Sequence, residues 1–135
     1  MTPTEIVQST MPLCATFGIT ASEFEPERVV LHLDWQAPLC TSAGLLHGGA
    51  LMALADSAAA GVAFLNLPEG ATGTSTIESK TNFLGAVRDG AVVTATATPL
   101  HRGSTTIVVE TELRTGDGKL VAKTTQTQAV LRPRA

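Results

Sequence analysis

Asp56 is the residue of this sequence best placed to do chemistry. It is the one carboxylate in an otherwise small and apolar run from His47 to Leu65. Taking an ionised carboxylate out of water is costly unless the group is partnered, so a core-type helix that keeps one usually has a use for it. A carboxylate in such a place can act as a general base or as a nucleophile.

The same run opens with His47-Gly48-Gly49, and Asp56 follows His47 by nine residues. Glycines at the start of a helix leave backbone N–H groups open and let a substrate approach closely. Such donors suit a carbonyl oxygen that develops negative charge during a reaction. The alternative is that the two glycines only make a tight turn before a core helix, and the pattern alone does not choose between the two interpretations.

Residues 50–65 contain helix formers, no proline and apolar side chains at helical spacing. We expect a helix that is enclosed on nearly all sides, because it is apolar nearly all round. On one continuous helix, nine residues turn roughly 900° and rise about 13 Å, so His47 and Asp56 point in opposite directions. Two copies related by a two-fold axis can still bring His47 of one copy to Asp56 of the other. The spacing therefore indicates a site shared between subunits.

Length and charge limit the classes of function. The 135 residues predict a single domain, 1–135, and the net charge of −3 without a basic patch argues against nucleic acid as a partner. The N-terminus lacks the features of a signal peptide, so a cytoplasmic location is expected. The apolar run is too short, and too interrupted by Asp56, to predict a membrane span.

No metal or cofactor is expected. Cys14 and Cys40 have no metal-binding or redox spacing, and His32, His47 and His101 are scattered along the chain. The two thiols are therefore interpreted as packed side chains.

The remaining elements form a β-rich pattern around the helix. We expect a short helix over residues 3–13 and two strands over 18–24 and 28–35. Four further strands are predicted from β-branched segments separated by Gly-containing turns, at residues 72–83, 91–100, 105–114 and 120–131. Consecutive hairpins predict an antiparallel meander, so the expected fold class is α+β with about five to six strands wrapping one long central helix.

At this point the chain resembles a known family. Gly44-Leu45-Leu46-His47-Gly48-Gly49 and Ala55-Asp56-Ser57-Ala58, followed by the β-rich tail, are similar to the hotdog-fold acyl-CoA thioesterases of the phenylacetate-degradation (PaaI-like) type. The similarity runs over residues 15–130. It implies a homodimer with a continuous sheet, often paired into a homotetramer, with active sites at the dimer interface.

The resemblance also implies roles for individual residues. Asp56 matches the catalytic acid, and Gly48 matches the glycine whose N–H polarises the thioester carbonyl. His47 matches the histidine that fixes this loop, beside Gly49 in the substrate-binding motif. Ser75 lies where a polar residue assists the attacking water in some relatives.

One position departs from the family pattern. Relatives commonly carry Asn or Gln six residues before the motif histidine, whereas this chain has Thr41. A hydroxyl is shorter than an amide and has fewer donors. Either Thr41 acts through a water, or Ser42 or Ser75 replaces it, or activity is weak.

The CoA moiety is expected at the turn His101-Arg102-Gly103-Ser104, because relatives approach the pantetheine or the phosphates there and an arginine suits phosphate. A solvated turn is the alternative for Arg102, Gly103 and Ser104. Lys80 and Arg88 are lesser candidates.

The predicted function is hydrolysis of a small, medium-chain or aromatic acyl-CoA to the free acid and CoA, with Asp56 as general base or nucleophile. The first alternative is a non-catalytic acyl-CoA-binding hotdog module. A second alternative is hydratase or dehydratase chemistry on the same fold, which the spacing of the acid and the histidine does not match.

Overall fold

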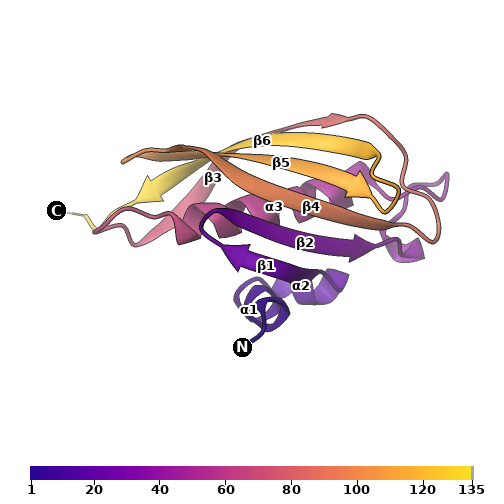
Figure 1. Ribbon diagram of the computed structural model, residues 1–135, viewed down its shortest axis with the longest axis horizontal. Helices are drawn as coiled ribbons and strands as arrows, with labels where there is room; N and C mark the ends of the chain where they lie inside the picture. The colour runs from indigo at the N-terminus through magenta and orange to yellow at the C-terminus, as the bar shows by residue number, and fades with distance from the viewer. Residues whose placement is uncertain (135) are drawn as a thin grey trace.

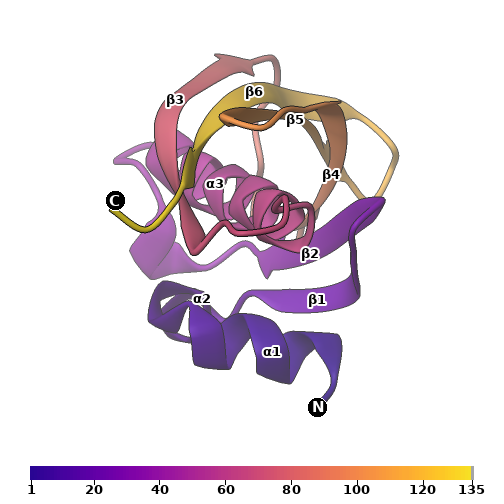
Figure 2. The ribbon, with the colours of Figure 1, turned by 90° about the vertical axis from the view of Figure 1, so that its left-hand side faces the viewer.

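One long helix lies in the curve of a six-stranded antiparallel sheet (Figures 1 and 2). The computed structural model describes residues 1–134. The elements in chain order are α1 (Pro3–Thr10), α2 (Pro12–Phe17), β1 (Thr20–Glu25), β2 (Arg28–Asp34), the 3-10 turn Ala37–Leu39, α3 (Gly48–Leu65), β3 (Gly73–Phe83), β4 (Val92–Arg102), β5 (Thr106–Thr115) and β6 (Leu120–Leu131). The predicted α+β class, with a sheet wrapped around a central helix, is confirmed.

The predicted four-strand meander is wrong. The strand order is β1-β2-β4-β5-β6-β3, so β3 lies beside β6 at one edge and β4 lies beside β2. Of these four strands, β4, β5 and β6 follow one another as hairpins. The segment between β3 and β4 is a crossing connection, because β3 lies beside β6 whereas β4 lies between β2 and β5. It is held by the N–H groups of Leu84 and Gly85, which donate to the Val121 carbonyl at 2.8 and 3.1 Å, and by the buried Val87. This connection brings β4 to the apolar strand β2, whose Val29 and Leu31 face the core.

The N-terminal helix is interrupted. Residues 3–13 were expected to form one helix, but α1 ends at Thr10 and α2 begins at Pro12. Met11 between them is extended, because the residue before a proline is pushed out of the helical region. Side-chain hydrogen bonds hold α1 on β1: Gln8 Nε2 donates to the Ile19 carbonyl at 2.9 Å, and Thr4 bonds to Ala21.

Helix α3 forms because both ends are capped and one face is apolar. His47 caps its start, and Asn66 at its end donates to the carbonyls of Val62 and Pro26 at 2.8 and 2.7 Å. The predicted apolar stripe consists of Leu51, Leu54, Ala55, Ala58, Val62 and Leu65. All of these side chains are buried except that of Leu65, which is half-buried. By length and hydropathy α3 would qualify as a membrane span, but it is the core helix of this fold and more than half buried.

One strip of α3 is open in the single chain, so the expectation of a helix enclosed on nearly all sides is wrong there. Met52 and Ala60 are half-buried, while Asp56 and Phe64 are exposed. These residues recur every fourth position and therefore share one helix face. The sheet's edge strand β3 runs beside this face but does not cover it (Figure 2).

Candidate functional site

The carboxylate of Asp56 is held by one of its two oxygens. Thr76 Oγ1 on β3 donates to Asp56 Oδ1 at 3.0 Å, and Gln126 Nε2 on β6 donates to the same oxygen at 2.7 Å. Among residues 1–134, none donates to Oδ2. One oxygen is therefore fixed and the other faces solvent, an arrangement that orients a carboxylate to accept a proton or to attack a carbonyl carbon.

Buried glutamines support this arrangement. Gln126 and Gln128 have exposed fractions of 0 and 1%, although glutamine is usually an exposed residue. Ser79 Oγ donates to Gln126 Oε1 at 2.7 Å, and this bond leaves the amide N–H₂ of Gln126 directed at Asp56 and at Gln128 Oε1, 2.8 Å away. Gln128 Oε1 also lies within hydrogen-bond distance of Thr76 Oγ1, so the single hydroxyl proton of Thr76 serves either Asp56 or Gln128 at one time. The network thus ties both donors of Asp56 to one buried strand.

Sequence reasoning missed both Gln126 and Thr76. A signal for the glutamine exists, because Gln126 and Gln128 alternate along a strand whose inward positions also include the buried Ala122 and Thr124. Two large amides on the core side of a strand need partners there. For Thr76 no signal separates it from the neighbouring threonines and serines of β3.

His47 caps α3 and leaves one N–H of the helix start open. Its Nδ1 accepts from the Gly49 N–H at 2.7 Å, so that amide is already occupied. The Gly48 N–H belongs to the first helical residue and has no acceptor among the described residues. Glycine fits closely at both positions, because a Cβ on Gly48 would lie 3.1 Å from the Phe83 ring and one on Gly49 would lie 3.0 Å from His47 Nδ1, so the neighbouring side chain would have to shift slightly. Gly48 is therefore the available donor of the motif.

Thr41 lies with Gly48 rather than with Asp56. The two line a cavity of about 350 Å³ whose walls include Leu51 and Phe83. Thr41 Oγ1 accepts from the Ala43 N–H at 3.2 Å, which leaves its own O–H free to donate. The structure thus places the Thr41 hydroxyl on the same cavity as the open N–H of Gly48.

Ser75 does not contact Asp56 within one chain. Side chains alternate along a strand, so Ser75 points to the opposite face of β3 from Thr74 and Thr76. It is exposed there. Its assisting role stays a prediction, and the hydroxyl that reaches the carboxylate is that of Thr76.

The CoA-binding candidates form the β4–β5 turn at one end of the sheet. The Gly103 N–H donates to the Thr106 carbonyl at 2.8 Å, and the Ser104 carbonyl accepts from Arg132 at 3.0 Å, while Arg102 is exposed. Arg102 pairs with Ile107, which in turn pairs with Gln128.

This turn is remote from the helix start in a single chain. Phe83, which packs on Gly48, pairs with Ala122 at the other end of β6. The positions of Ala122 and Gln128 along β6 are about 20 Å apart at the usual rise of a strand. The turn and Gly48 therefore do not form one site within one chain.

Asp56 and Gly48 are separated too. Eight residues along α3 correspond to about 12 Å of rise and a net rotation of about 80°. The carboxylate and the open N–H lie at different places on the helix, as the sequence predicts. No three His, Cys, Asp or Glu side chains among residues 1–134 lie close enough to share a metal ion.

With the geometry established, comparison with known proteins gives the family. The model of the thioesterase superfamily matches residues 43–122, which include Gly48, Asp56 and Thr76. The chain belongs to this superfamily. A curated relative of this thioesterase, the candidate esterase SSO2140 of Saccharolobus solfataricus, is 32% identical over 128 residues, which cover 95% of this chain and 89% of the relative.

Solved structures agree with this assignment. The thioesterase HI1161 of Haemophilus influenzae superposes with a TM-score of 0.87 at 28% identity, covering 98% of this chain and 92% of the other. The PaaI protein of the Escherichia coli phenylacetic acid degradation operon has a TM-score of 0.85 at 23% identity, covering 96 and 91%, which shows the shared fold. The predicted hotdog-fold, PaaI-like thioesterase family is confirmed, and the protein is a thioester hydrolase.

Proposed function

We propose that this thioesterase hydrolyses acyl-CoA to the free acid and CoA at a site shared by two copies of the chain. The observation that carries the proposal is the Asp56 carboxylate, fixed through Oδ1 by Thr76 and Gln126 with Oδ2 open. A carboxylate held in one orientation needs little reorganisation before it reacts.

The Gly48 N–H supplies the second requirement of thioester hydrolysis. The thioester carbonyl oxygen accepts from this amide, which is oriented by the helix before any substrate arrives. Attack on the carbonyl carbon makes the oxygen negative, and the hydrogen bond then strengthens. Expulsion of the CoA thiolate restores the carbonyl and leaves the acyl carbon bonded to the attacking oxygen.

Asp56 serves the attacking group in one of two ways. As a general base it takes a proton from a water that attacks the carbonyl carbon, and that proton passes on to the departing thiolate. As a nucleophile it forms a mixed anhydride that water then hydrolyses. Both routes use the same open Oδ2 and the same Gly48 amide, so the proposal does not depend on the choice.

A second copy joins the two halves of the site. Strand β3 is an edge strand with one unpaired side, and its Ile77 has an exposed fraction of 63%. An exposed, partly apolar edge is suited to pairing with an identical strand. Pairing there would cover the open strip of α3 that carries Asp56 and would bring in the partner's helix start. A homodimer, and a homotetramer of two such dimers, are therefore proposed.

Release of free thiol from a panel of acyl-CoA substrates tests the proposal. Asp56→Asn should lower kcat by about 10²- to 10⁴-fold. Asp89→Asn is the matched control, because Asp89 is an exposed aspartate in a turn away from α3. Full activity of Asp56→Asn would remove this residue from the mechanism.

Mixed dimers test the sharing of the site. Gly48→Pro removes the N–H of that position and Asp56→Asn removes the carboxylate, so each homodimer should be nearly inactive. A heterodimer of the two variants contains one site with both native groups, and activity should return on mixing under exchange conditions. If the two groups belong to one chain's site, every mixture stays inactive.

The proposal also covers the CoA-binding turn between β4 and β5 and the cellular location, and it has one alternative. Arg102, Gly103 and Ser104 are proposed to contact the CoA moiety of a substrate held by another copy, and the location is proposed to be cytoplasmic. A non-catalytic acyl-CoA-binding module is the second candidate, favoured by Thr41 in place of an amide. Binding of acyl-CoA without thiol release would support it.

A further inference from the structure

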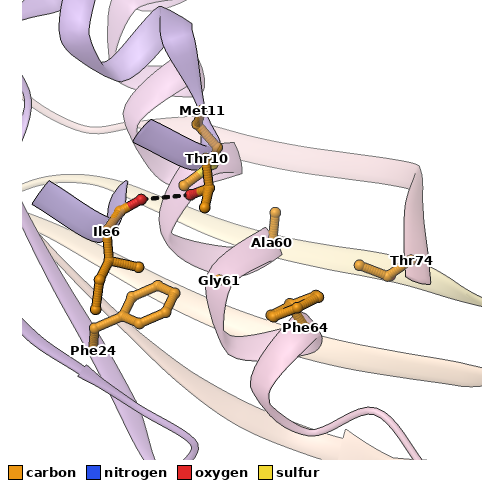
Figure 3. A pocket seen from close by; sticks show the side chains of 8 residues that line it. All are labelled: Ile6, Thr10, Met11, Phe24, Ala60, Gly61, Phe64 and Thr74. Atoms are coloured by element: carbon orange, nitrogen blue, oxygen red, sulfur yellow. Dashed lines mark hydrogen bonds between the residues drawn. The ribbon is translucent and has the colours of Figure 1, made fainter. Parts of the chain in front are cut away.

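An apolar cavity lies one helical turn beyond Asp56. It has a volume of about 400 Å³, which is in the range of small-molecule sites. Figure 3 shows side chains of α1, α3, β1 and β3, and of Met11 after α1, around it; the apolar ones are Ile6, Met11, Phe24, Ala60 and Phe64. All of these side chains are hydrocarbon or thioether, so the cavity favours an apolar occupant.

The cavity lies next to the proposed reaction centre along α3 and β3. Ala60 follows Asp56 by four residues on α3, so it lies on the same helix face about 6 Å further along the axis. On β3, the lining residue Thr74 lies two positions from Thr76, which bonds to Asp56. A chain that starts at a carbonyl beside Asp56 and runs along this face enters the cavity directly.

The two hydroxyls of the lining already use their protons within the protein. Thr10 Oγ1 donates to the Ile6 carbonyl at 2.7 Å, and Thr74 Oγ1 donates to the Ala129 carbonyl at 2.9 Å and accepts from Gln128 at 3.1 Å. A hydroxyl on the occupant would find no donor for its own oxygen there, and the Thr10 oxygen is left to accept its proton, so it would regain fewer hydrogen bonds than it loses to water.

The walls of the cavity are fixed rather than loose. A Cβ built on the buried Gly61 would lie 2.8 Å from Phe24 Cε2, so the Phe24 ring sits directly on the backbone of α3. The α1 wall is held on β1 by the hydrogen bonds of Thr4 and Gln8. A preformed cavity of this kind can select substrates by size.

We infer that this cavity receives the acyl group of the substrate and selects unsubstituted hydrocarbon acyl groups over hydroxylated ones. The inference rests on the proposed function, because it takes the carbonyl to lie beside Asp56. It predicts that kcat/KM rises about fourfold for each methylene added until the cavity is full. It also predicts that phenylacetyl-CoA exceeds 4-hydroxyphenylacetyl-CoA by about tenfold or more.

Filling the cavity tests the assignment. Ala60→Phe should lower the ratio of octanoyl-CoA to acetyl-CoA hydrolysis, in kcat/KM, by at least about tenfold. Gly61→Ala should lower the same ratio less, since it displaces only the Phe24 ring. Ala15→Phe is the matched control: it adds the same ring to an exposed position of α2 outside the cavity and should leave the ratio unchanged. Circular dichroism confirms that each variant is folded.

A binding measurement separates this inference from the proposed function. Calorimetric titration compares CoA with its S-octyl thioether, which cannot be hydrolysed, on the native protein and on Ala60→Phe. Tighter binding of the octyl compound that is lost in Ala60→Phe supports the cavity whether or not thiol is released. The cavity assignment is overturned if hydrolysis depends on Asp56 but does not change with chain length, with the 4-hydroxyl group or with Ala60→Phe. That result would leave the proposed function intact.

Discussion

Replacing Gln126 by methionine should impair the chemistry of the site without changing its shape. Methionine has nearly the volume of glutamine but no amide. Gln126→Met therefore removes the 2.7 Å hydrogen bond to Asp56 Oδ1 and leaves Thr76 as the carboxylate's remaining donor among the described residues. The carboxylate then loses the bond that ties it to the buried strand β6.

The size of the effect follows from the nature of that hydrogen bond. A bond to an ionised group contributes about 1.5–3 kcal/mol. If the bond serves to hold Oδ2 in its reactive direction, its loss raises the activation barrier by up to that amount and lowers kcat by about 10- to 150-fold. KM should change little, because Gln126 is buried and does not reach the substrate.

Gln128→Met is a matched control for this experiment. Gln128 lies two positions along the same strand and is equally buried, but it does not contact Asp56. Each variant removes one buried amide from one network, so both should lower the free energy of unfolding by about 1–3 kcal/mol. Only Gln126→Met should show the large loss in kcat.

The assay is thiol release at saturating substrate, with stability measured by urea unfolding. Equal losses of kcat in the two variants would refute the reasoning, because the effect would then come from the network in general and not from the contact with Asp56. A folded Gln126→Met protein with native kcat would show that the carboxylate needs no orientation from β6.

Three further results are expected. Gly48→Pro should lower kcat by about 10²- to 10³-fold, because it removes the N–H. Gly48→Ala keeps the N–H and should lower kcat less; steady-state thiol release measures both. Proline suits this first helical position, which follows an extended residue, so the helix start should be retained. Thr76→Val should lower kcat more than Ser75→Ala in the same assay, because only the threonine bonds to Asp56. Burial raises the pKa of the Cys14 thiol above its ordinary value of 9.0, and a hydrogen bond with Ser57 partly offsets this rise. The stabilisation from the buried neutral thiol is therefore full below pH 9 and is lost as the pH rises through the raised pKa. The urea midpoint of the native protein should then fall more steeply above pH 9 than that of Cys14→Ala, and parallel curves would contradict the assignment.

Much of the site's composition could be predicted from local pattern. The apolar run of α3, its glycine-rich start and its single acid are neighbours in the chain, and helical geometry fixes their relative directions without reference to any other element. The alternating strands of the tail were predicted for the same reason, since alternation is a local property. These features carried the resemblance to the family and the prediction of a site shared by two copies.

The partners of Asp56 depended on strand order, which the local pattern does not contain. Thr76 and Gln126 are 50 residues apart in the chain and meet because β3 pairs with β6 and not with β4. A connection between β3 and β4 can either turn back as a hairpin or cross to another strand, and its residues allow both. The sequence alone thus determined the family and the candidate groups for the chemistry. The long-range pairing of the sheet decided which side chains hold the Asp56 carboxylate and where the apolar cavity lies, because both are made by surfaces that touch only after folding.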